Sequence, residues 1–165
     1  MKRRPAQVPG LAAEPRPAKS LRMRDLLASF SRFKKLPVSQ QRLLVETVAN
    51  LAWAAFAVQA IPFRRLVSTR PPARGADMAP VELRRLARTV ENVARRVPWR
   101  AVCIEQAVCL RAMLRRRGIS SEFHYGIARG DQADLKGHVW LSVGEEVVIG
   151  GQVAGDFTLV GSFPS

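Results

Sequence analysis

Acidic side chains are scarce in this sequence. Its 165 residues include 13 Asp and Glu against 27 Lys and Arg, a formal net charge of +14. Residues 1–36 hold ten of those cations and two of the acids, a balance of +8. With 47% hydrophobic residues, the chain is too apolar to be wholly disordered, and its length suits one sizeable core but hardly two. We therefore expect one core and an N-terminal segment that carries most of the basicity.

Cysteine is also scarce, with Cys103 and Cys109 the two present. Both lie in a stretch with a helical pattern, where six residues rise about 9 Å. A disulfide tolerates a Cα separation of roughly 7 Å at most, so we expect both thiols to be free, as in a reducing compartment. The basic start is followed by the Pro-rich residues 5–10 instead of the apolar run of a secretory signal. These features predict a cytoplasmic protein.

No apolar run reaches the length that a membrane-spanning helix normally needs. The stretch Thr47–Phe63 has no charge, but it is shorter than the roughly 20 apolar residues required, and Asn50 and Gln59 interrupt it. We interpret it as part of a buried or interfacial helix. That helix would start at an N-cap on Ser39 and stop before Pro62.

The composition divides the chain into three regions. Residues 1–20 are rich in proline and basic residues and predict a flexible arm. Residues 21–97 predict a helical N-terminal region, which includes a short basic amphipathic helix at Arg24–Phe33 and a longer helix at Val81–Val97. A basic helix of this kind can contact an acidic partner or lie peripherally on a membrane.

The third region, residues 98–165, changes from helix to strands. A helix is expected from about Ala101 to Arg117, with cations in its last turn and Gly118 after it. Strands are then expected at Glu122–Ile127, Gly137–Val143 and Val147–Ile149, with a fourth at Asp156–Val160. Helices followed by an antiparallel sheet predict an α+β fold.

Cys103 stands in the first turn of the helix predicted after Pro98. Backbone N–H groups and the positive end of the helix dipole favour a thiolate there, and the same N–H groups could hold an oxyanion. The position is therefore suited to a nucleophile. A small buried hydrophobe is the other interpretation, because free cysteine is among the most buried residue types.

A base for this thiol has to be one of two histidines, His124 or His138. On its strand His138 shares a face with Trp140 and Ser142, while the alternate residues, Val139 among them, point toward the core. His138 is thus expected on the face that is less committed to packing. Either histidine could instead be structural, because spacing in sequence does not prove contact.

Three segments of the C-terminal region form a recognisable combination: the run from Pro98-Trp99-Arg100-Ala101-Val102-Cys103 to Arg115-Arg116-Arg117-Gly118-Ile119, then Gly137-His138-Val139-Trp140-Leu141, then Val147-Val148-Ile149-Gly150-Gly151. Together they resemble the transglutaminase-like core of lasso-peptide leader peptidases, the B proteins of lasso-peptide biosynthesis. The similarity is strong over residues 98–160 and weak over 40–97. Each segment alone is a weak signal, and the combination is fairly specific.

The resemblance implies a papain- or transglutaminase-like core in which Cys103 is the nucleophile and His138 its base. Related enzymes usually orient the imidazole with an acid or amide from the next strand, and here that strand ends in two glycines. Asp156 is the candidate third residue. Gln152 and two aspartates upstream of His138 are the alternatives, and a Cys-His dyad without a third member is also open.

The activity implied is a cysteine peptidase that removes the leader from a precursor peptide without a cofactor. By the same resemblance, the freed core peptide passes to a separate ATP-dependent lasso cyclase. Leader recognition in the family uses a small strand-rich domain, and residues 1–97 show helices and a basic arm instead. A separate leader-recognition protein is therefore the expected partner.

Three other functions fit parts of the sequence. The net charge of +14 would give affinity for nucleic acid, although no recognised nucleic-acid-binding pattern is present and we expect no such partner. A transglutaminase-like hydrolase or acyltransferase for another amide would use the same cysteine and histidine. A non-catalytic scaffold with this fold would explain the lack of an obvious third residue.

Overall fold

The computed structural model describes residues 33–68, 76–129 and 134–164. Its elements are α2 (Val38–Ala60), α3 (Phe63–Val67), α4 (Pro80–Ala94), α5 (Cys103–Arg116), β1 (Glu122–Arg129), β2 (Leu135–Val143), β3 (Glu146–Ile149), the 3-10 helix η1 (Gly151–Asp156) and β4 (Thr158–Pro164). Helices come first and strands last, so the predicted α+β class is confirmed. The arm predicted at 1–20, and the basic helix predicted at Arg24–Phe33 except for its last residue, lie outside the described residues.

Helix α2 begins two residues earlier than expected. Pro37 occupies the N-cap position with φ −54°, so the prediction that Ser39 caps the helix is wrong. Proline has no side-chain acceptor for the first-turn N–H groups, and this end of the helix has no side-chain cap within the described residues. The side chain of Gln41 donates to the Leu36 carbonyl at 2.8 Å. The end is as predicted: Ile61 adopts an extended conformation because it precedes Pro62.

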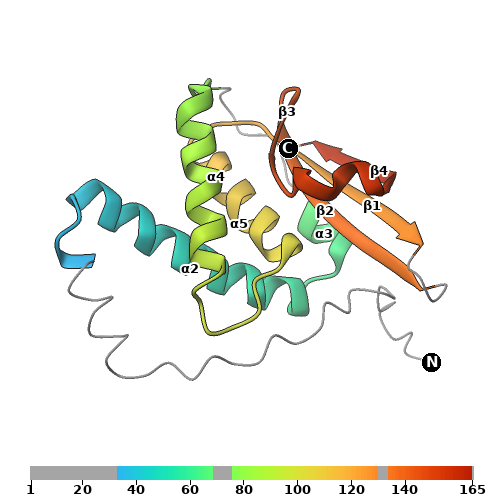
Figure 1. Cartoon of the computed structure of the whole chain (residues 1–165), viewed down its shortest axis with the longest axis horizontal. Coiled ribbons are helices and arrows are strands. Elements are labelled where there is room, and N and C mark those ends of the chain that lie inside the picture. The colour runs from blue at the N-terminus through green and yellow to red at the C-terminus, as the bar shows by residue number, and fades with distance from the viewer. Residues whose placement is uncertain (1–32, 69–75, 130–133, 165) are drawn as a thin grey trace.

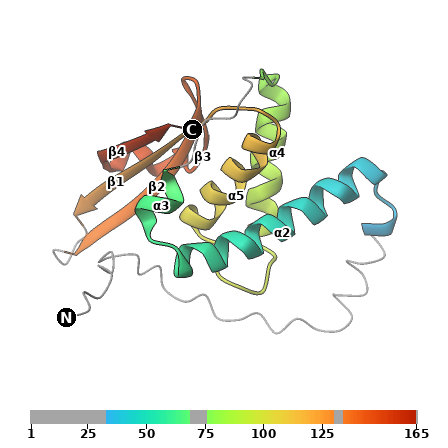
Figure 2. The same ribbon diagram turned by 180° about the vertical axis from the view of Figure 1, so that it is seen from behind.

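One hydrophobic core joins the helices to the sheet. Figures 1 and 2 show α2, α4 and α5 grouped on one side and the strands on the other, with α5 between α2 and the sheet. Fully buried residues come from both parts, and they include Leu51, Val90, Leu110, Phe123 and Leu141. The element that bears Cys103 is therefore held between the other helices and β2.

The four strands form an antiparallel sheet in the order β3-β2-β1-β4. His138 pairs with Gly126 and Trp140 with His124 across β2 and β1. As predicted, Val139 and Leu141 face the core, where they are 1% and 0% exposed. These contacts fix which residues of β2 face α5.

The opposite face of the sheet is covered as well, which the alternating pattern did not predict. Trp140 is only 8% exposed, so this face is also packed, although less completely than the face of Val139 and Leu141, as expected. The chain returns over it after β3, and a Cβ on Gly126 would lie 2.9 Å from both the Trp140 ring and Phe157. Asp156 ends η1 instead of opening the fourth strand.

An ion pair ties α2 to the end of α5. Arg117 donates to both carboxylate oxygens of Glu46, at 2.9 and 2.6 Å, and Arg116 donates to Asn50 one turn away. The hydrogen bond from Arg117 lowers the pKa of Glu46 although burial opposes it. The carboxylate therefore stabilises the folded state at pH values above the ordinary range of a glutamate.

We predict that Glu46→Gln lowers the free energy of unfolding at pH 7 by about 1 kcal/mol, because a partly exposed charged pair is lost. A lowered folded-state pKa gives stability that is present above about pH 4.5 and is lost as the pH falls through the folded value. The deficit measured by urea unfolding should therefore shrink toward pH 3. The exposed Glu145→Gln is the control, and an equal Glu46→Gln deficit at both pH values would contradict this account.

Candidate active site

Cys103 is the first residue of α5 and so lies in its first turn as predicted, although the helix starts two residues later than the expected Ala101. Val102 before it is extended, and its N–H donates to the Glu105 carboxylate at 2.9 Å. The Gln106 side chain donates to the Ala101 carbonyl at 2.8 Å. Two side chains from the first turn thus fix the backbone on which the sulfur is carried.

The Cys103 sulfur lies against β2. The backbone N–H groups of Val139 and Ile104 act on it in the direction that lowers its pKa. Val139 directly follows His138, so Cys103 lies beside the backbone of the strand that carries the predicted base. Neighbouring residues of a strand point to opposite faces, and no hydrogen bond between the Cys103 and His138 side chains is seen within the described residues. Cys103 itself is partly buried.

Burial decides the protonation of this thiol. Desolvation raises the pKa of Cys103 above its ordinary value, the N–H groups of Val139 and Ile104 lower it by less, and the nearby charge of Glu105 raises it further. The expectation that the start of a helix alone would favour the thiolate is therefore wrong on balance. A thiol at rest needs a base that removes its proton as it attacks.

His138 is oriented by a backbone carbonyl. Its Nε2 lies 2.7 Å from the Gly150 oxygen, and because a carbonyl can only accept, Nε2 carries the hydrogen. The ring also packs on Phe157 at 5.0 Å and on Trp140 at 6.0 Å between centroids. In the neutral form of the ring, Nδ1 then carries no hydrogen and can accept a proton.

Gly150 is the functional residue that sequence reasoning missed. It has φ +77°, and a Cβ added there would lie 2.6 Å from the Val139 carbonyl oxygen. Only glycine fits this turn, which aims its carbonyl at His138. The sequence signal for it is the pair of glycines that directly follows β3, where the resemblance leads one to expect an acid or amide.

Asp156 lies at the exposed end of η1, and no hydrogen bond or ion pair of its carboxylate is seen within the described residues. Gln152 lines a depression of about 340 Å³ beside Gly150, together with Glu91 and residues 147–151. The third-residue role of Asp156 stays a prediction, and the observed Nε2 partner of His138 is the Gly150 carbonyl.

The two remaining residues of interest have other surroundings. His124 has both ring nitrogens at 2.8 Å from serine hydroxyls, Nδ1 from Ser162 and Nε2 from Ser142, so the geometry favours His138 as the base. Cys109 is fully buried, which raises its pKa to about 12. Neither thiol forms a disulfide, as predicted.

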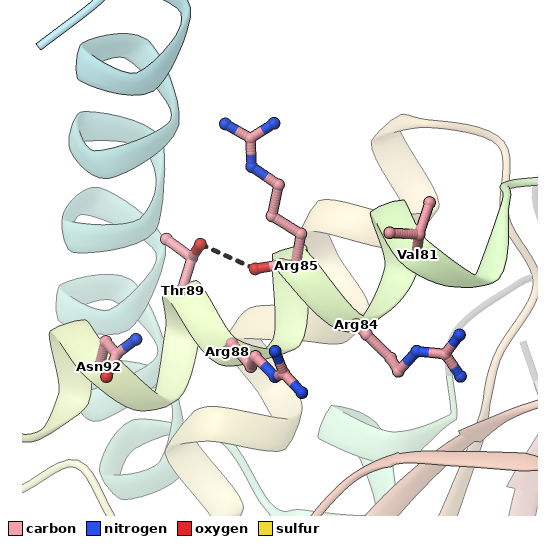
Figure 3. Close-up of a pocket in the computed structure, with 6 residues that line it drawn as sticks. All are labelled: Val81, Arg84, Arg85, Arg88, Thr89 and Asn92. Atoms are coloured by element: carbon pink, nitrogen blue, oxygen red, sulfur yellow. Dashed lines mark hydrogen bonds between the residues drawn. The ribbon is translucent and has the colours of Figure 1, made fainter.

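A second depression, also about 340 Å³, lies on the outer face of α4. Figure 3 shows that Arg84 and Arg88 extend to one side of the helix and Arg85 to the other. Arg84 is paired with Glu146 at 2.9 Å. These arginines do not form one continuous row, so they give no support to a nucleic-acid interface. No cluster that could hold a metal ion is found in the described ranges either.

Comparison with known families agrees with this geometry. The family model described as the transglutaminase-like superfamily matches residues 42–161. The match covers most of the chain, which therefore belongs to this superfamily. Searches of curated proteins and of solved structures found no significant match.

We predict that Gly150→Ala is more disruptive than Gly144→Ala. Both glycines have positive φ, but nothing lies within 4 Å of a Cβ on Gly144. Gly144→Ala should cost about 1 kcal/mol of backbone strain, and Gly150→Ala a further 1 to 3 kcal/mol from overpacking. Urea unfolding of the two variants measures the difference, and equal losses would show that the Gly150 turn is not tightly constrained.

We predict that iodoacetamide labels Cys103 alone in the folded protein, because Cys109 is buried and has a pKa of about 12. The rate should rise with pH through a midpoint above the ordinary thiol value of about 8.5. Intact mass gives the stoichiometry: one label in wild type and in Cys109→Ala, none in Cys103→Ala. Labelling of Cys109 without denaturant would contradict the packing described here.

Proposed function

We propose that this protein is a cysteine peptidase that removes the leader from a lasso-peptide precursor. Proteins of the transglutaminase-like superfamily are typically cysteine peptidases or transferases. The observation that carries the proposal is the place of Cys103 at the first residue of α5, where the Val139 N–H of β2 acts on its thiol, together with His138 on the same strand, whose Nε2–H is held by the Gly150 carbonyl. A nucleophile and an oriented base then lie on adjoining elements, α5 and β2.

In the proposed reaction, Nδ1 of His138 takes the proton of the Cys103 thiol as the sulfur attacks the carbonyl carbon of the scissile peptide bond. Backbone N–H groups at the start of α5 stabilise the oxyanion. The imidazolium then protonates the leaving amine, the C–N bond breaks, and the leader remains attached as a thioester. Water, deprotonated by His138, hydrolyses the thioester, which frees the leader as an acid and restores the thiol.

The choice of a lasso-peptide precursor rests on the three sequence segments that contain Cys103, His138 and Gly150. The partners proposed with it are a separate leader-recognition protein and an ATP-dependent cyclase that takes the new amino terminus, all in the cytoplasm. Within the described part of the N-terminal region, residues 33–68 and 76–97, the structure has helices and no strands. This is consistent with leader recognition by another protein.

Another amide substrate is the second candidate, since superfamily membership alone fits a hydrolase or an acyltransferase. The same thiol and imidazole would form the thioester in either case. The two candidates differ in the acyl donor and in whether water or an amine accepts the acyl group.

The test is cleavage of the precursor peptide from the same genome, with its leader-recognition protein present, followed by mass spectrometry. We expect Cys103→Ala to abolish cleavage and His138→Ala to reduce the rate by about 10²- to 10⁴-fold, because general acid–base catalysis is lost. Cys109→Ala is the matched cysteine control and should retain activity. Cleavage by Cys103→Ala at the wild-type rate would refute the peptidase, and no cleavage by wild type would favour another amide.

A further inference from the structure

One side of α2 is apolar and has no covering element among the described residues. Its large side chains are Val45, Val48, Trp53 and Phe56, which are 58%, 40%, 48% and 68% exposed. We call these four residues the apolar face of α2. Soluble proteins seldom expose neighbouring large apolar side chains unless they meet another surface.

The opposite side of α2 is committed to the fold. Leu51, Ala54 and Ala57 are completely buried, and Glu46 and Asn50 bind the arginines at the end of α5. Within the described residues α2 is the one helix long and apolar enough to cross a membrane, and 28% of its most apolar window is buried. Spanning would break these contacts, whereas a helix that lies along a surface keeps them.

The charges around this face have one sign. No charged residue occurs from Thr47 to Phe63, while exposed Lys35 and Arg42 precede the apolar face and exposed Arg64 and Arg65 follow it. The one acid within residues 33–68 is Glu46, which is bound by Arg117. Residues 1–36 add a balance of ten cations to two acids. An apolar centre with cationic ends is complementary to an anionic lipid surface.

We propose that α2 docks in parallel on an anionic phospholipid bilayer, with Trp53 and Phe56 at the boundary between headgroups and acyl chains. Aromatic side chains favour this depth, and the flanking cations contact the headgroups. A second copy of the chain fits less well, because contact through the same face of two copies would bring their flanking cations together. The docking does not depend on the proposed peptidase activity.

The experiment measures binding of the full-length protein to vesicles of phosphatidylcholine with about 30% phosphatidylglycerol, by co-sedimentation at low and high salt. Wild type should bind these vesicles, bind pure phosphatidylcholine much more weakly, and lose affinity as salt rises. The double variant Trp53→Ser/Phe56→Ser should lose at least about tenfold in vesicle affinity, because two aromatic anchors are removed. It keeps every cation of the chain.

The matched control is Val81→Ser/Leu159→Ser, which removes two apolar side chains that are 70% and 53% exposed on other elements. It should bind vesicles as wild type does, and both double variants should keep the wild-type thermal midpoint. Absence of wild-type binding would overturn the proposal. Equal vesicle binding by wild type and Trp53→Ser/Phe56→Ser would also overturn it, because the affinity would then come from charge alone. A wild-type dimer in light scattering that becomes a monomer in this variant would overturn it as well, because the face would then be a contact between two copies of the chain.

Discussion

The structure depends on the contact between the start of α5 and the middle of β2. Packing of α5 against the sheet buries Leu110, Phe123 and Leu141, and it brings the Cys103 sulfur to the N–H of Val139. The same strand carries His138, whose ring is held by the Gly150 carbonyl and by two aromatic rings. Hydrophobic packing therefore supplies the positional accuracy, and a few hydrogen bonds set the orientation of each reacting group.

Much of this arrangement could be predicted from the sequence, because it follows from local patterns. The proline before α5 and Gly118 after it bound the helix that carries Cys103, and alternation along β2 separates the core residues from His138. Both candidate residues lie on the elements expected for them. Helix boundaries, strand alternation and the first-turn position of a cysteine are local properties, which a single sequence contains.

The remaining features depend on contacts between distant segments. The orienting partner of His138 is a main-chain oxygen, and main-chain atoms leave no side-chain signature except the glycine that permits the turn at Gly150. Burial of Trp140 depends on how the chain returns after β3, and the raised pKa of Cys103 depends on how deeply the sulfur is packed. For the first of these reasons the sequence predicts an acid such as Asp156 as the partner of His138 and does not indicate the Gly150 carbonyl.

The central claim is that Cys103 and His138 act as one proton-transferring pair, and the nitrogen spectrum of the His138 imidazole tests it most directly. Resonances of a ¹⁵N-histidine-labelled protein are assigned with His124→Gln and compared between wild type and Cys103→Ala. The account predicts that the hydrogen of the neutral ring lies on Nε2, and that the Nδ1 resonance moves when the thiol is removed. Hydrogen on Nδ1, or an Nδ1 resonance that is the same in both proteins, would contradict it.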